Sequence, residues 1–340
     1  MFSPKYEIAE TLTGHTSSIT VVLFSPDGEY LASGSESGVV LVTATESWET
    51  VKTLVNVSPV TALLWDPTFP VTLVCGFASG ATLTVHIGES DLDRSEHGVW
   101  ADTFDGPIHC ISINDLGHIL AIGHGREVTL LDQRTLSYWE NNRTMPSPPE
   151  FTEGLPAPCP RVLHFMKDGR LVVAYMDHGI VCWDVASMSV LWNIVPRSCS
   201  LGWSAISPGE KHIVVSNLFD GLDFYSIANC TLSHSVPCPI NQQSNALVPV
   251  LYSSDGSAVI VGGTSGSVRV LDSRSCETLQ VLSHDGDLIQ AVDSCTTADG
   301  SQIIAAGVGI SSGATVITSP APGPPKPGAP ASPRNTYPDL

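Results

Sequence analysis

A short pattern of tight turns recurs along the chain and limits the possible folds more than any other feature. Its clearest copy runs from Leu12 to Leu54, where three apolar segments are separated by turns at residues 25–28 (SPDG) and 36–38 (ESG). Asp-Gly and Ser-Gly supply the positive φ that short hairpin loops need, and the flanking residues are β-branched or aromatic. The copy therefore predicts a meander of antiparallel strands, which a fourth strand at Thr50–Leu54 completes.

Six further copies of this pattern follow the first. Seven copies between Gly14 and Thr318 average about 44 residues each, inside the roughly 40–45 residues of a propeller blade. One such sheet cannot bury both of its faces, so we expect the copies to stack around an axis. We expect the innermost strands of five copies to begin with apolar residues, which predicts an apolar channel mouth: Ile19, Val60, Ile108, Val162 and Ile289.

The glycine-histidine pair at 14–15, the SPDG turn, the hairpin turns and the Trp-Asp pair at 183–184 together resemble the WD-repeat β-propeller family. The resemblance implies an all-β fold over residues 5–318, a seven-bladed β-propeller with four-stranded antiparallel blades. The last copy ends one strand short, so we expect the N-terminal strand Tyr6–Leu12 to close the last blade and remove two exposed sheet edges. Residues 319–340 hold eight prolines, which predicts a disordered tail.

In that family a His, a Ser or Thr, an Asp and a Trp form a hydrogen-bonded tetrad within a blade. No copy here keeps all four residues. The first copy has His15 and Ser33, and we place Glu36 at the Asp position and Val42 at the Trp position. We therefore expect the blades to depend more on apolar packing between strands.

The composition limits the classes of partner. Fifteen basic and thirty-four acidic residues give a net charge of −19, which repels nucleic acid and anionic membrane surfaces. The first residues lack a basic and apolar leader, so we expect a soluble, non-secreted protein of the cytoplasm or nucleus. Nine cysteines form no Cys-x-x-Cys pair and are expected as buried thiols.

Candidate catalytic and metal motifs have simpler interpretations. Residues 309–313 match the Gly-x-Ser-x-Gly of a hydrolase, but no histidine follows Ser311, so a hairpin is favoured. His178 beside Asp177 is predicted to be a turn residue, because the histidines show no recognised ligand spacing. We expect no catalytic residue, no metal site and no cofactor.

Two segments resemble the Trp-Asp-x-Arg box with which some WD-repeat proteins dock on the adaptor of a cullin ubiquitin ligase. Both segments, 131–134 and 271–274, have Leu in place of Trp. An Arg after a strand-ending Asp also occurs where the Asp caps a turn, and we favour that interpretation. The residues that would carry docking are Asp132, Arg134, Asp272 and Arg274.

We expect a scaffold or adaptor, monomeric within a larger complex, that binds a protein or peptide on the axial face. A substrate receptor of a cullin ligase and a propeller hydrolase with an axial site are the alternatives. The Pro-rich insertion Met145–Pro160 is expected on the same face as the binding surface. Large apolar residues next to hairpin turns are expected as exposed anchors, with two polar residues in comparable positions: Phe77, Met176, Phe219, His124 and Ser35.

Overall fold

The computed structural model describes residues 6–69, 71–87, 100–135, 138–149, 154, 156–198, 200–238, 247–283, 288–297, 300–309 and 314–318. The predicted tail at 319–340 and Ser311 lie outside the described residues. The described part of the chain contains strands and no helix, and so no helix that could cross a membrane.

Strands pair in chain order into four-stranded antiparallel blades. The first blade contains β2 (Ile19–Phe24), β3 (Tyr30–Ser35), β4 (Val39–Ala44) and β5 (Thr50–Val55), and the second β6 (Val60–Trp65), β7 (Thr72–Phe77), β8 (Ala81–His86) and β9 (Ala101–Thr103). The third blade contains β10 (Ile108–Ile113), β11 (Ile119–His124), β12 (Glu127–Thr135) and β13 (Tyr138–Thr144), and the fourth β14 (Pro160–Phe165), β15 (Leu171–Tyr175), β16 (Gly179–Asp184) and β17 (Ser189–Ile194).

The same pairing continues to the end of the described chain. The fifth blade contains β18 (Trp203–Ile206), β19 (His212–Ser216), β20 (Gly221–Ser226) and β21 (Thr231–Pro237), and the sixth β22 (Val250–Tyr252), β23 (Ala258–Val261), β24 (Ser267–Asp272) and β25 (Thr278–Ser283). The closing blade contains β26 (Ile289–Thr296), β27 (Gln302–Val308), β28 (Ala314–Thr318) and β1 (Glu7–Leu12). The all-β propeller with four-stranded antiparallel blades is confirmed.

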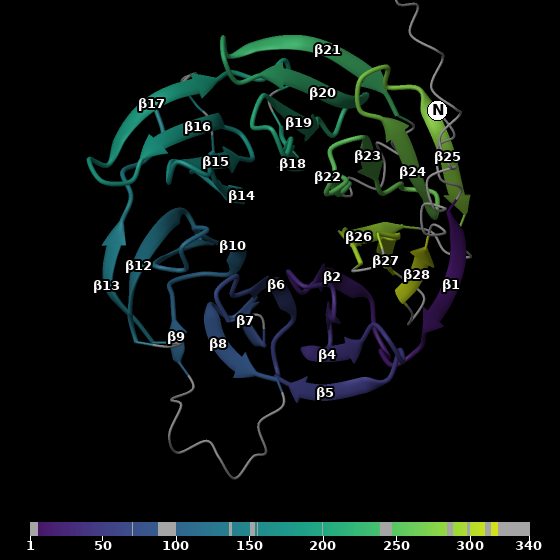
Figure 1. Cartoon of the computed structure of the whole chain (residues 1–340). Coiled ribbons are helices and arrows are strands. Elements are labelled where there is room, and N and C mark those ends of the chain that lie inside the picture. Colours follow the sequence, from purple (N-terminus) through teal and green to yellow (C-terminus); the bar gives the residue numbers. More distant parts are fainter. Residues whose placement is uncertain are drawn as a thin grey trace, which may run out of the picture.

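The blades form a ring in which each sheet packs against its two neighbours (Figure 1). The innermost strands contact each other in the order β2, β6, β10, β14, β18, β22, β26 and back to β2. Apolar residues of neighbouring blades pack together in shared clusters. Val40 of the first blade and Leu73 of the second belong to one such cluster. Leu31 and Ala305 likewise join the first and closing blades. The core therefore lies between the sheets.

The ring closes through the N-terminal strand. β1 pairs antiparallel with β28, from Glu7 opposite Thr318 to Leu12 opposite Ala314, which confirms the predicted closure of this blade. Tyr6 is buried just before β1: its N–H donates to Gln280 Oε1 at 2.8 Å, and Gln280 Nε2 donates to Tyr6 O at 2.7 Å. Closure thus also ties the N-terminus to β25 of the sixth blade.

The first blade keeps half of the tetrad. His15 Nε2 and Ser33 Oγ are hydrogen-bonded at 2.8 Å, and both side chains are buried. In the first blade Thr43 is paired with Leu31, and at the equivalent position of the fourth blade Trp183 is paired with Leu171. Our placement of Val42 at the Trp position was therefore wrong by one residue, because in this register Thr43 takes the place of the Trp.

The Asp position of the tetrad needs the same correction. Three residues separate the paired strands in both hairpins, 36–38 in the first blade and 176–178 in the fourth. Asp177 is the middle residue of its hairpin, and Ser37, not Glu36, is the middle residue in the first blade. A recess of about 230 Å³ remains beside His15 and Thr43, where the larger side chain is missing.

A partly buried carboxyl, that of Asp293, lies between the first and closing blades. The Phe24 N–H on β2 donates to Asp293 Oδ2 on β26 at 2.7 Å. Burial raises the pKa of Asp293 to about 7, although hydrogen bonds from the N–H groups of Phe24 and Ser294 act in the opposite direction. The folded ring therefore favours the protonated form of this carboxyl more than the unfolded chain does.

Deleting residues 1–11 should lower the melting temperature strongly, because the deletion removes most of β1 and exposes the edge of β28. Deleting residues 319–340 is the matched control and should leave the melting temperature nearly unchanged, since this segment has no apolar periodicity. Thermal unfolding followed by circular dichroism measures both. Equal melting temperatures for the full chain and the N-terminal deletion would contradict the closure.

Asp293→Asn should stabilise the ring at pH 8 and have little effect near pH 4. Asp293 loses its proton near pH 3.8 in the unfolded chain and near pH 7 in the folded one, so its contribution to stability is lost as pH rises between these values. Asn keeps an oxygen that can accept the Phe24 N–H, and it cannot ionise. The difference between the two pKa values sets an upper bound of about 4 kcal/mol on the gain in the free energy of unfolding. Urea unfolding at both pH values tests this, and a gain independent of pH would exclude the ionisation.

Candidate functional site

A cavity of about 640 Å³ opens at the axis of the ring. Its walls come from the first residues of the innermost strands and from the loops leading into them. The hairpins that join the second and third strands of a blade lie on the same face of the ring as the loops that lead into the innermost strands. Two hydrogen bonds link such a hairpin to such a loop: the N–H of Ala78 donates to Pro59 O, and the N–H of Met176 donates to Cys159 O, both at 2.9 Å. The described end of the Pro-rich insertion, at Cys159, therefore lies on the face we predicted for it.

Polar side chains reach the cavity through β-bulges. In five blades of the described chain the pairing register shifts next to one residue near the start of the innermost strand. A bulge leaves one residue without a partner and redirects its side chain. These five residues also line the cavity: Thr20, Thr61, His109, Arg161 and Gln290.

The expectation of an apolar channel mouth holds only in part, because Val60 and Ile108 line the cavity but polar bulge residues line it as well. Ile19, Val60, Ile108 and Ile289 are fully buried, and Val162 is 7% exposed. These side chains pack mainly between blades, as Ile289 does with neighbours from the sixth and closing blades. The neighbouring bulge residues supply most of the polar part of the lining.

Two of the bulge residues link neighbouring strands. Thr20 Oγ1 donates to Val60 O at 2.6 Å, across the boundary between the first and second blades. Thr61 Oγ1 donates to Gly76 O at 3.2 Å within the second blade. Both hydroxyls are engaged by backbone carbonyls, so the bulge residues that offer other chemistry to the cavity are His109, Arg161 and Gln290.

Arg161 is the one cation among the described lining residues. Its Nε is buried and has no hydrogen-bond partner in the described part of the chain. Burial lowers the pKa of His109, and the charge of Arg161 lowers it further, so His109 is neutral near pH 7. Glu36 also lines the cavity but is exposed and belongs to the first blade, three blades from Arg161 around the ring.

The structure places the predicted anchor residues in different environments. Phe77 is 2% exposed and belongs to the core cluster of the first two blades, so the expectation that it is exposed was wrong. β7, the strand that carries Phe77, is covered on both faces. The aromatic side chain of Phe77 fills space between the first two blades. Met176 is half-buried, while Phe219 is 62% exposed.

The two polar residues of that group hold their hairpins together. Ser35 is fully buried, and its hydroxyl donates to Val39 O at 3.1 Å. His124 is also buried, with Nε2 hydrogen-bonded to Thr129 Oγ1 at 2.8 Å and Nδ1 to Asp105 O at 3.0 Å. Both side chains are saturated by local contacts, which leaves them little capacity to bind a partner.

A polar network fixes the loop that carries Phe219. Asn217 Oδ1 accepts the N–H groups of Phe219 and Asp220, both at 3.0 Å. Asn217 Nδ2 donates to Asp220 Oδ1 at 2.7 Å, and Arg197 Nη2 donates to Asp220 Oδ2 at 2.6 Å. The exposed aromatic ring is thus presented by a well-braced turn at the axial face.

The two segments that resemble the Trp-Asp-x-Arg box differ in geometry: residues 131–134 lie within β12, whereas Asp272 ends β24 at a turn. Asp132 accepts a hydrogen bond from Arg143 Nη2 at 2.8 Å across β12 and β13. Asp272 accepts the N–H groups of Arg274 at 3.0 Å and Ser275 at 2.7 Å, so it caps the turn after β24. Arg274 is exposed, and the side chain of Arg134 lies outside the described part. These contacts explain both Asp residues without a docking partner.

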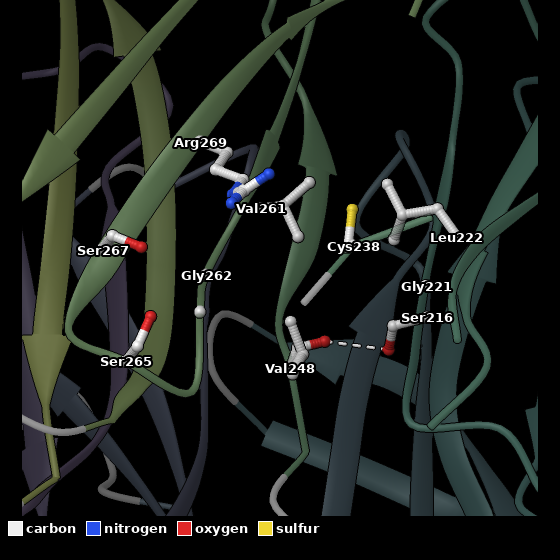
Figure 2. Close-up of a pocket in the computed structure, with 11 residues that line it drawn as sticks. Ser216, Gly221, Leu222, Cys238, Val248, Val261, Gly262, Ser265, Ser267 and Arg269 are labelled. Carbon is white, nitrogen blue, oxygen red and sulfur yellow. Dashed lines mark hydrogen bonds between the residues drawn. The ribbon is translucent and has the colours of Figure 1, made fainter. Parts of the chain in front are cut away.

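A much smaller cavity lies between the fifth and sixth blades (Figure 2). Ser216 Oγ donates to Val248 O at 2.9 Å at its edge, and Cys238 and Arg269 face it from the two blades. Its volume of about 20 Å³ is near the space needed for one water molecule. It therefore has room for about one water molecule and is too small for a larger ligand.

The anchor assignment can be tested by two substitutions. Phe77→Ala should lower the free energy of unfolding by about 3–5 kcal/mol, because it leaves a cavity in the core. Phe219→Ala should change it by less than about 0.5 kcal/mol, because the ring is exposed. Urea unfolding measures both, and similar losses for the two variants would show that Phe219 is packed.

The comparisons with known proteins concern one part of the ring. The family model described as WD domain, G-beta repeat matches residues 7–42, which span β1 to most of β4. A search of curated proteins found no match. The repeat match and the ring of four-stranded antiparallel blades together support the assignment of this chain to the WD-repeat β-propeller family.

Proposed function

We propose that this chain is a seven-bladed WD-repeat scaffold that binds a peptide segment of a partner protein across the mouth of the axial cavity. The observation that carries the proposal is the cavity of about 640 Å³ with polar bulge residues converging on it. Ligand sites are typically concave, with volumes of roughly 300–1,000 Å³ and a few convergent polar groups. The ring of blades supplies a rigid frame for such a site.

The surroundings of the cavity favour a peptide over a small metabolite. The cavity is open to solvent at the axial face, where Glu36 of the hairpin between β3 and β4 lines it. Trp203 lines the cavity, and Phe219 is exposed on a hairpin of the same blade. Aromatic side chains commonly provide the anchors of protein interfaces. A segment that enters the cavity can therefore continue over the hairpins toward Phe219.

A binding role also accounts for the hydroxyl groups of the site better than hydrolysis does. A hydrolytic nucleophile needs an adjacent base that accepts its proton. The hydroxyls of Thr20 and Thr61 donate to the backbone carbonyls of Val60 and Gly76. We propose accordingly that the protein has no enzymatic activity and acts through its partners.

The test starts from a random peptide library displayed on phage and selected on the immobilised full chain. Selected peptides are synthesised, and their dissociation constants are measured by fluorescence anisotropy. Phe219→Ser and Gln290→Ala should each weaken binding by about 1–3 kcal/mol, the range of interface anchors. Melting temperatures of both variants should remain close to that of the unmodified chain.

The control is Leu191→Ser on β17, which changes an exposed apolar residue on the outer rim. It should leave the dissociation constants unchanged. If Leu191→Ser weakens binding while Phe219→Ser and Gln290→Ala do not, the partner binds the rim. If no peptide binds at micromolar concentration, the proposed scaffold role of the axial face is wrong.

A further inference from the structure

Arg161 is a cation for which the described chain provides no partner. It lies at the bulge of β14, half-buried, with its Nε shielded from solvent and without a hydrogen bond. A buried donor without a partner costs stability, and such groups in folded proteins call for an explanation. This cation persists in a chain whose net charge is −19, where carboxylates are the most abundant charged groups.

The neighbours of Arg161 favour an external anion. His109, on the adjacent blade, is held neutral by burial and by the positive charge of Arg161. Thr20 and Thr61 already donate to backbone carbonyls. Glu36 is an exposed carboxylate three blades away and repels an anion from its own side of the cavity. An anionic group that enters is therefore directed toward Arg161.

We propose that Arg161 binds the carboxylate of an Asp or Glu residue in the peptide that enters the axial cavity. This inference rests on the proposed function and adds the chemistry that selects the peptide. The guanidinium group has a planar fork of donors that matches a carboxylate, and hydrogen bonds between such charged groups are among the strongest in proteins. A partner carboxylate also neutralises the charge that the described chain leaves unpaired.

The surroundings favour a carboxylate over a phosphate group. Sites that recognise phosphorylated peptides usually assemble clusters of Arg residues. Among the described lining residues a single Arg faces the cavity, its His neighbour is neutral, and a Glu lies across the ring. One guanidinium balances one carboxylate, whereas a phosphate group carries close to two negative charges at pH 7.

The experiment uses a peptide array on which each random nonapeptide is printed with Glu, Gln or phosphoserine at its centre. The full chain, fluorescently labelled, should bind the Glu versions at least tenfold more strongly than the Gln versions. Arg161→Gln should abolish this ratio, and Arg161→Lys should retain part of it. Arg126→Gln, which removes an exposed cation from the hairpin after β11, is the matched control and should keep the full ratio.

The outcomes separate this inference from the proposed function. If the unmodified chain binds Glu and Gln versions equally, the axial scaffold stands and carboxylate selection is wrong. If phosphoserine versions bind best and depend on Arg161, the ligand is a phosphopeptide and the inference is overturned. If no version binds, both proposals fail. A melting temperature of the Arg161→Lys variant near that of the unmodified chain shows that any lost selectivity does not come from unfolding.

Discussion

Burial of apolar side chains between neighbouring blades is the interaction on which the rest of this structure depends. Each sheet is apolar on both faces and cannot bury both alone, so each blade relies on the next. Leu31 and Ala305, for instance, share a cluster although they lie at opposite ends of the sequence. The pairing of β1 with β28 completes the last sheet and removes its exposed edge, which gives a short N-terminal strand a large structural effect.

The same packing determines what the axis can present. The buried residues at the starts of the innermost strands, such as Ile19 and Ile289, are packed between blades and expose no surface to the cavity. An extra residue in the strand provides the polar lining without disturbing that packing, because a bulge leaves it outside the pairing register. Thr20 and Thr61 use this position to link strands, whereas Arg161 uses it to place a charge beside a cavity.

Much of the fold could be predicted because it is encoded locally. Turn residues such as Asp27-Gly28 mark hairpins, and the spare segment before Gly14 indicated the closing strand. The candidate site could not be predicted in the same way. Phe77 was expected to be exposed from its place beside a turn, but its burial depends on the neighbouring blade. The channel lining depends on bulges, and a shift of one residue reverses which side chain faces the axis.

In this structure, bulges turn polar side chains of the innermost strands toward the axis while their apolar neighbours stay packed between blades. The most direct test of this arrangement is thiol labelling of single substitutions, Thr61→Cys and Gln290→Cys against Val60→Cys and Ile289→Cys. Peptide mass spectrometry distinguishes each new thiol from the native ones. We predict fast modification at 61 and 290 and slow modification at 60 and 289 in the folded chain. Equal rates within each pair, or the reverse order, would contradict this arrangement.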